Sequence, residues 1–204
     1  LRVDDLEGRA RALLIHYATH AVVLGPSNCK YSADYPGVLQ ATVEEAMPGT
    51  QAMFVQGGAG DINPLFLARS GNEEVDFRVV QKMGETLAEE VIRANQRVQP
   101  VSKQQPAIRW RTDNMAFAHR WEKNQTLDVG ITTVLIGNDV GIGTVPGEPM
   151  HRLQTIWKQQ DDVPNTLYYG YTVTSTGGWP GYIPDLRSAA YGGYGADAST
   201  NIEV

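Results

Sequence analysis

Two histidines stand four residues apart near the start of the sequence, in the run His16-Tyr17-Ala18-Thr19-His20. On a helix this spacing would place both imidazoles on one face, as in metalloproteases, but those enzymes carry glutamate where Tyr17 stands. The run Ala12 to Thr19 is short and apolar, which favours a buried strand. Residues four apart on a strand are separated by about 13 Å, too far for one metal ion. At most one of the two is a ligand, and His20 is the better candidate because a strand gives way to loop there. A buried histidine with ordinary hydrogen bonds remains the alternative for each.

A glycine-rich loop, Gly57-Gly58-Ala59-Gly60-Asp61-Ile62-Asn63-Pro64, offers a second set of candidates. Gly58 and Gly60 let the backbone approach a ligand closely and are candidate substrate-binding positions. Asp61 and Asn63 are polar groups on a constrained turn that could orient a substrate, a water molecule or a metal ligand. The loop lacks both common nucleotide-binding patterns, so nucleotide binding is not favoured. Ordinary turn formation explains these residue types equally well.

A carboxylate and a group of phenols form the third set. Glu148, in Val145-Pro146-Gly147-Glu148-Pro149, is predicted between a strand and a helix. It is either a metal ligand or a favourable charge in the first turn of that helix. Tyr182, Tyr191 and Tyr194 lie in a tail rich in glycine and aromatic residues, which either lines a pocket or forms a surface loop. Tyrosine hydroxyls in such a pocket can donate to a developing oxyanion. Cys29 is the only cysteine, so a site built from histidine and carboxylate is favoured over a cysteine zinc site.

These residues must be positioned by alternating strands and helices. We expect strands at 12–19, 51–56, 108–118, 131–136, 140–145 and 167–173, and helices at 34–47, 73–97, 148–160 and 185–190. The 137–139 turn is expected to join two strands as a hairpin. Strands and helices mix along the whole chain, which indicates an α/β or α+β fold in one domain spanning residues 1–204.

Composition excludes several classes of protein. The chain has 204 residues, of which 42% are hydrophobic and 20% charged, as in ordinary globular domains rather than disordered ones. No apolar run approaches the length of a transmembrane helix. The net charge of −6, without a block of Lys or Arg, argues against a nucleic-acid partner.

Taken together, the motifs resemble the N-terminal catalytic domain of the neutral/alkaline (non-lysosomal) ceramidase family. The resemblance runs from about Leu13 to Thr200 and rests on the order and spacing of several short matches. These are A-T-H at His20, S-N-C-K-Y-S-A-D-Y-P-G from Ser27, G-D-I-N-P from Gly60, V-P-G-E from Val145 and G-Y-I from Gly181, followed by A-x-x-Y-x-A-D-A-S-T. Glu148 and Tyr182 are 34 residues apart, similar to the spacing in the family.

The resemblance implies an α/β fold with a mixed sheet flanked by helices and a zinc-dependent amidase activity on the N-acyl bond of ceramide. His20, Glu148 and Tyr182 match zinc ligands, and Tyr194 matches a tyrosine that contacts the reacting carbonyl. The loop carrying Asp61 and Asn63 matches the loop of the active-site serine. A lipid or small amide substrate, and a secreted, periplasmic or cell-surface location, follow from the same resemblance.

Two departures from the family pattern matter. Asn63 occupies the serine position, and an amide cannot form an acyl-enzyme. The family's first zinc histidine lies well upstream of the position of His20, so we expect a missing N-terminal segment or a partner chain to supply it. The leading hypothesis is a zinc-dependent amide hydrolase that uses a metal-activated water. The alternative is a catalytically inactive, ceramidase-like binding or assembly protein.

Overall fold

The computed structural model describes residues 1–99, 106–173, 175 and 177–203. The chain divides into two compact units. One consists of Leu1–Val55 and Asn63–Pro100, and the other of Gln56–Ile62 and Val101–Val204. Each unit is described by itself.

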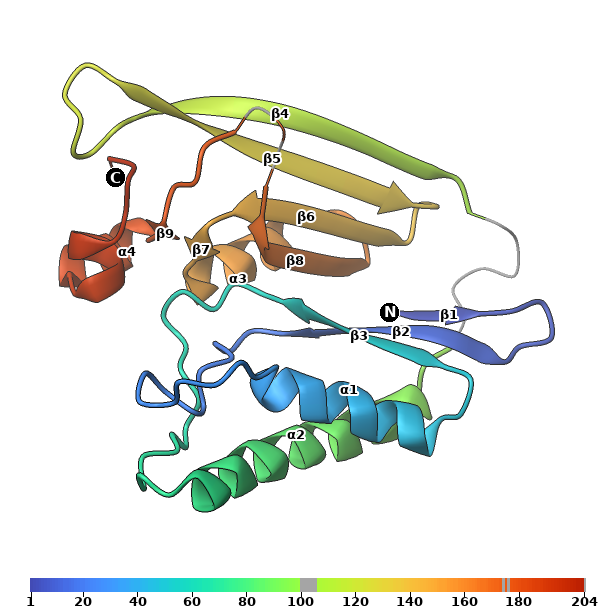
Figure 1. The fold of residues 1–204 in the computed structure, drawn as a ribbon. Helices are drawn as coiled ribbons and strands as arrows, with labels where there is room; N and C mark the ends of the chain where they lie inside the picture. The colour runs from blue at the N-terminus through green and yellow to red at the C-terminus, as the bar shows by residue number, and fades with distance from the viewer. Residues whose placement is uncertain (100–105, 174, 176, 204) are drawn as a thin grey trace. The chain divides into compact units, whose positions relative to one another are not determined.

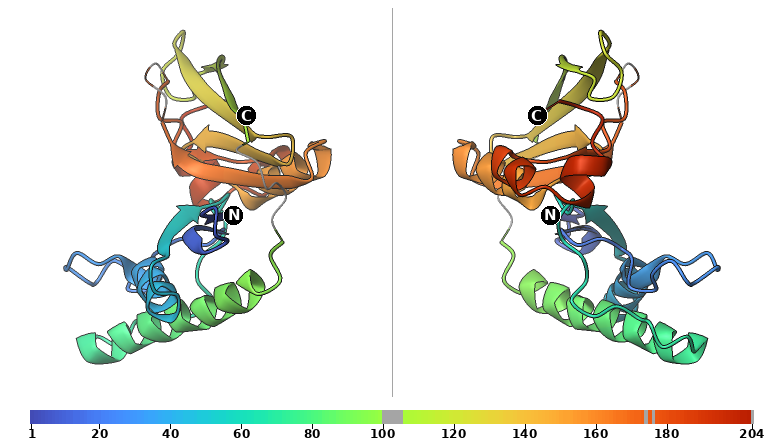
Figure 2. Two further views of the ribbon diagram at one scale, coloured as in Figure 1. Left: turned by 90° about the vertical axis from the view of Figure 1, so that its right-hand side faces the viewer. Right: turned by 90° about the vertical axis from the view of Figure 1, so that its left-hand side faces the viewer.

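The first unit is a three-stranded sheet with two helices on one side (Figure 1). The strand order is β1 (Arg2–Asp4), β2 (Ala10–Tyr17) and β3 (Gln51–Gln56), with β1 antiparallel to β2. The helices are α1 (Asp34–Ala46) and α2 (Glu73–Asn95), which lie side by side (Figure 2).

Alternation in β2 and helical spacing in α1 explain the core of this unit. Leu13 and Ile15 are buried on one face of β2, and Leu39 and Val43, one turn apart, are fully buried on α1. These side chains form one cluster with Ala88 of α2. Leu13 and Ile15 follow the two-residue period of a strand, and Leu39 and Val43 lie one helical turn apart. Packing among these side chains joins the sheet to its helices.

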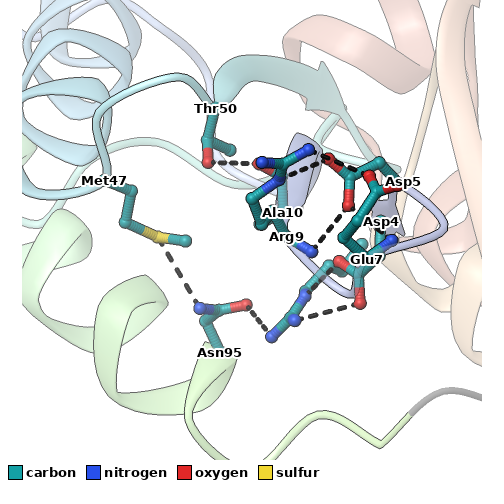
Figure 3. Close-up of polar contacts among 9 residues, drawn as sticks. Asp4, Asp5, Glu7, Arg9, Ala10, Met47, Thr50 and Asn95 are labelled. Carbon is teal, nitrogen blue, oxygen red and sulfur yellow. Dashed lines mark hydrogen bonds and ion pairs between the residues drawn. The ribbon is translucent and has the colours of Figure 1, made fainter.

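Polar contacts tie the ends of these elements together (Figure 3). The Arg9 guanidinium donates to the Asp5 carboxylate at 2.8 Å across the β1–β2 turn. The Thr50 hydroxyl donates to the Ala10 carbonyl at 3.0 Å, and the Asn95 amide contacts the Met47 sulfur at 3.6 Å. The last of these contacts joins the C-terminal ends of α1 and α2.

The second unit contains a four-stranded mixed sheet. Its order is β4 (Ile108–Ala118), β5 (Thr126–Ile136), β6 (Val140–Pro146) and β8 (Asn165–Thr172). The first three strands pair antiparallel, and β8 pairs parallel with β6 after a crossover through α3 (His151–Gln160). Trp157 of α3 packs on the sheet at Gly143, where a Cβ atom would lie 2.5 Å from the indole.

A small parallel ladder stands beside this sheet. It pairs β7 (Glu148–Pro149) with β9 (Tyr182–Ile183). The α4 helix (Leu186–Tyr191) and a single turn of π-helix, η1 (Tyr194–Ala198), follow β9 along the chain. The ladder joins two segments that are far apart in sequence.

The mixed α/β architecture predicted from the sequence is confirmed, including the 137–139 hairpin turn between β5 and β6. Strands β3 and β4 have the predicted bounds. The predicted helix at 148–160 is wrong at its start, because Glu148 and Pro149 form β7 and the helix begins at His151. The short elements β1, β7, β9 and η1 were not predicted. Among the described residues, no helix is both long and apolar enough to cross a membrane.

The close packing of α1 and α2 gives a first prediction. A Cβ atom at Gly84 would lie 2.5 Å from the Val38 Cβ atom. Alanine at this helix position would gain about 1 kcal/mol in propensity, but overpacking costs about 1–3 kcal/mol. We therefore expect Gly84→Ala to lower the free energy of unfolding in denaturant titrations. Glu89→Ala, on the exposed face of α2, should change it by less than about 0.5 kcal/mol. A Gly84→Ala variant more stable than the parent would contradict this packing.

Candidate functional site

Glu148 and Tyr182 lie directly opposite each other in the β7–β9 ladder. The Glu148 N–H donates to the Gly181 carbonyl at 2.8 Å, and the Met150 N–H donates to the Ile183 carbonyl at 3.0 Å. Paired residues on neighbouring strands project to the same face of a sheet. Two of the three predicted metal ligands are therefore brought together, although they are 34 residues apart in sequence.

Glycines on both sides make this close pairing possible. Gly147 and Gly181 have positive φ angles of 76° and 71°, in the left-handed region that side chains disfavour. A Cβ atom at Gly147 would lie 2.3 Å from the Gly181 carbonyl oxygen. The V-P-G-E and P-G-Y-I motifs thus carry glycine where the two turns approach each other.

Two phenols meet the Glu148 carboxylate. The Tyr171 hydroxyl donates to Glu148 Oε2 at 2.7 Å, and the Tyr182 hydroxyl also hydrogen-bonds this carboxylate. Burial raises the pKa of both phenols above the usual tyrosine value, and the hydrogen bond to Glu148 and its negative charge raise each pKa further. Both hydroxyls are protonated at neutral pH and serve as donors to the carboxylate.

Tyr194 extends this cluster. Its ring meets the Tyr182 ring edge to face, with centroids 5.6 Å apart. Tyr194 begins the π-helical turn η1 and is 72% exposed. A Cβ atom at Gly195 would lie 2.7 Å from the Tyr182 ring, which explains why glycine follows Tyr194.

The glycine loop packs against the strand that carries Glu148. The Gly60 N–H donates to the Pro149 carbonyl at 2.9 Å, and a Cβ atom at Gly60 would lie 2.4 Å from the Glu148 carbonyl oxygen. The Gly58 N–H donates to the Gln154 side chain at 2.9 Å. Both amides thus have acceptors within the protein, which gives the glycines a packing role, and substrate binding by Gly58 and Gly60 stays a prediction.

Asp61 caps the helix that follows Glu148. Its Oδ1 atom accepts a hydrogen bond of 2.7 Å from the His151 N–H at the start of α3. A carboxylate at this position satisfies a helix N–H group and interacts favourably with the helix dipole. The contact supplies a structural reason for Asp61, and its predicted role in holding water or substrate is untested.

His20 belongs to the first unit, three residues after β2 ends, so its predicted place at the end of a strand is confirmed. Its segment is held by Tyr35, a fully buried residue whose hydroxyl donates to the Thr19 carbonyl at 2.6 Å. Burial raises the pKa of the Tyr35 phenol. The buried Asp34 carboxylate accepts from the Leu24 N–H at 3.1 Å and fixes the far side of the same segment.

Asn63 is exposed and is likewise part of the first unit. Its predicted catalytic role is not tested by the contacts within that unit. His16 lies inside β2, as the sequence predicted.

The donor chemistry of the Glu148 cluster fits a divalent metal ion. A carboxylate and a phenol in hydrogen-bond contact present two oxygen donors at one point, which zinc accepts. Within the described part of the chain, no group of three or more His, Cys, Asp or Glu side chains is placed to hold a metal. Tyr182 as a metal ligand beside Glu148 stays a prediction that follows from the resemblance.

A cavity lies elsewhere in the second unit. It has a volume of about 530 Å³ and is lined by residues such as Arg109, Leu135, Ile142 and Trp157. Ile142 precedes Glu148 by six residues along β6 and the following turn, a distance of about 20 Å in extended chain. The cavity is therefore separate from the Glu148 cluster.

Tyr171 is the member of the cluster that the sequence did not predict. It lies at the end of β8 with a positive φ angle of 58°, an unusual conformation for an aromatic residue. The available signal was the run Tyr168-Tyr169-Gly170-Tyr171, in which a glycine interrupts an aromatic strand and can mark a bulge.

Comparison with known proteins gives likeness of fold. No family model and no curated protein matches the sequence. Solved structures match over nearly the whole chain, among them two ceramidases. Neutral ceramidase from Pseudomonas aeruginosa has a TM-score of 0.70 at 13% identity, over 96% of this chain and 42% of that one. A ceramidase complexed with C2 has a TM-score of 0.73 at 12% identity, over 98% of this chain and 44% of that one. The chain thus spans less than half the length of either protein.

The turn before Glu148 gives a second prediction. Gly147→Ala should place a Cβ atom 2.3 Å from the Gly181 carbonyl and separate β7 from β9. Gly137→Ala is the matched control, because Gly137 also has a positive φ angle but its nearest neighbours lie at 3.5 Å. We expect Gly147→Ala to cost at least about 1–3 kcal/mol more in unfolding free energy than the control. Equal losses in the two variants would contradict the close approach of the two turns.

Proposed function

We propose that this chain carries part of the catalytic domain of a zinc-dependent hydrolase that cleaves an amide bond. The observation that carries the proposal is the Glu148 carboxylate paired with Tyr182 and hydrogen-bonded by two phenols. The ceramidase-like fold supports it. An N-acyl lipid such as ceramide is the proposed substrate, with related amides or esters as variants of the same chemistry.

Glu148, Tyr182 and His20 would hold the zinc ion. A further histidine would come from a segment outside residues 1–204 or from a partner chain. Bound zinc supplies a Lewis acid that lowers the pKa of water and polarises a carbonyl group. Tyr194, which is exposed, would donate a hydrogen bond to the substrate carbonyl oxygen as negative charge develops there.

Asn63 determines which nucleophile the proposal uses. A side-chain amide orients a water molecule or a carbonyl through hydrogen bonds but does not become acylated. We therefore assign the attack to water, with Asn63 and Asp61 as groups that would hold the water or the polar head of the substrate. A secreted, periplasmic or cell-surface location is proposed with the ceramidase-like function.

A non-catalytic binding or assembly protein is the second candidate, and the observation that favours it is again Asn63 in place of a serine. The two functions differ in one measurable property. The hydrolase would release fatty acid from a fluorogenic N-acyl sphingosine, whereas the binding protein would retain zinc without turning over any lipid amide.

Replacement of Glu148 gives the third prediction. Glu148→Gln preserves size but removes the charge that binds a cation, so bound zinc should fall to background and hydrolysis of the fluorogenic amide should fall at least roughly 100-fold. Zinc content is measured by elemental analysis after dialysis. Glu122→Gln, an exposed carboxylate in the same unit, is the control and should keep its zinc. Undiminished zinc in Glu148→Gln would refute the ligand assignment.

A further inference from the structure

We propose that Tyr171 is a positioning residue that holds the Glu148 carboxylate in the orientation needed to bind a metal ion. This inference rests on the proposed function, because it concerns the same metal site. Nothing in the sequence motifs assigns a role to Tyr171. Its placement follows from three features of the structure: a hydrogen bond, a second attachment through the backbone, and an irregularity in β8.

The hydrogen bond is direct. The Tyr171 hydroxyl donates to Glu148 Oε2 at 2.7 Å, the short distance typical of a donor to a charged carboxylate. Tyr182 hydrogen-bonds the same carboxylate from the β9 side. Glu148 is therefore restrained by two phenols from two different strands, of which only Tyr182 was expected as a metal ligand.

The backbone of Tyr171 is attached to the same turn. Its N–H donates to the carbonyl of Gly147, the residue before Glu148, at 2.9 Å. Tyr171 thus hydrogen-bonds the backbone beside Glu148 through its N–H and the Glu148 carboxylate through its hydroxyl. The Tyr171 ring also packs against Trp179, with centroids 6.2 Å apart, so the ring itself is restrained.

The irregularity in β8 explains why the side chain reaches Glu148. Thr144 pairs with Tyr169 and Pro146 with Thr172, so β8 advances three residues where β6 advances two. Gly170 and Tyr171 therefore lie where β6 has a single residue, and Tyr171 has a φ angle of 58°. A bulge of this kind redirects a side chain and is common beside active sites.

A purely structural tyrosine would not need this arrangement. Tyr171 is 42% exposed, so its burial does not compensate for a left-handed backbone on an aromatic residue. Such strain concentrates where a side chain must be held for function. Groups that orient the ligands of a metal typically change its affinity 10–100-fold when they are replaced.

The test compares Tyr171→Phe, which keeps the ring but removes the hydroxyl, with the control Tyr191→Phe, which removes a hydroxyl from a 79% exposed tyrosine in the same unit. Zinc affinity of the purified protein is measured by competition with a chromophoric chelator. We expect Tyr171→Phe to bind zinc roughly 10–100-fold more weakly and Tyr191→Phe to bind as the parent does. The visible spectrum of the cobalt-substituted protein should change in Tyr171→Phe alone. Circular dichroism of the metal-free variants should be unchanged.

Other outcomes separate this inference from the proposed function. Unchanged zinc affinity in Tyr171→Phe overturns the positioning role, while loss of zinc in Glu148→Gln in the same assay leaves the proposed metal site standing. An altered circular dichroism spectrum of metal-free Tyr171→Phe also overturns it, because the tyrosine would then be supporting the fold. Parental zinc affinity in Glu148→Gln overturns both.

Discussion

The two-residue parallel ladder between β7 and β9 is the constraint on which the candidate site depends. It sets Glu148 opposite Tyr182 and leaves both side chains on one face, where their polar groups meet. The ladder is too short to be stable alone. It is supported by the glycine loop beneath Glu148, by β8 and by the π-helical turn, which presents Tyr194 to the Tyr182 ring. The chemistry of the cluster is therefore a product of chain pairing rather than of any local motif.

Positions with demanding backbone geometry or no room for a side chain gather around this ladder. Gly147 and Gly181 take left-handed conformations, Gly60 admits no side chain against β7, and Tyr171 adopts a left-handed conformation in a bulge. The glycines adopt these conformations without steric cost, whereas the left-handed backbone of Tyr171 is strained and persists only where surrounding contacts determine it. The hydrogen bonds of Tyr171 reach the Glu148 carboxylate and the neighbouring Gly147 carbonyl, which is why we place the proposed function at Glu148 and not at the cavity on the sheet.

The sequence predicted β4 and α2 well, because they are long enough for apolar periodicity or strand-forming residues to show. It placed only the second half of β5, which begins at Thr126 rather than at the predicted residue 131. It could not predict β7 and β9, since two residues have no periodicity and their pairing joins segments 34 residues apart. Glu148 was accordingly predicted in a first helical turn. The resemblance to the ceramidase family, carried in part by the V-P-G-E and G-Y-I motifs, nevertheless assigned Glu148, Tyr182 and Tyr194 to one site. Tyr171 was missed because Gly170 can mark a bulge in the strand but does not show which side chain the bulge turns toward a carboxylate.

The central claim is that Glu148 and Tyr182 bind the same metal ion. Anomalous scattering at the zinc absorption edge, from crystals of the zinc-saturated protein, tests it most directly. The account predicts one strong peak within about 2.0–2.2 Å of a Glu148 carboxylate oxygen and of the Tyr182 phenol oxygen. A peak bound by other residues, or none at this position under zinc saturation, would contradict it.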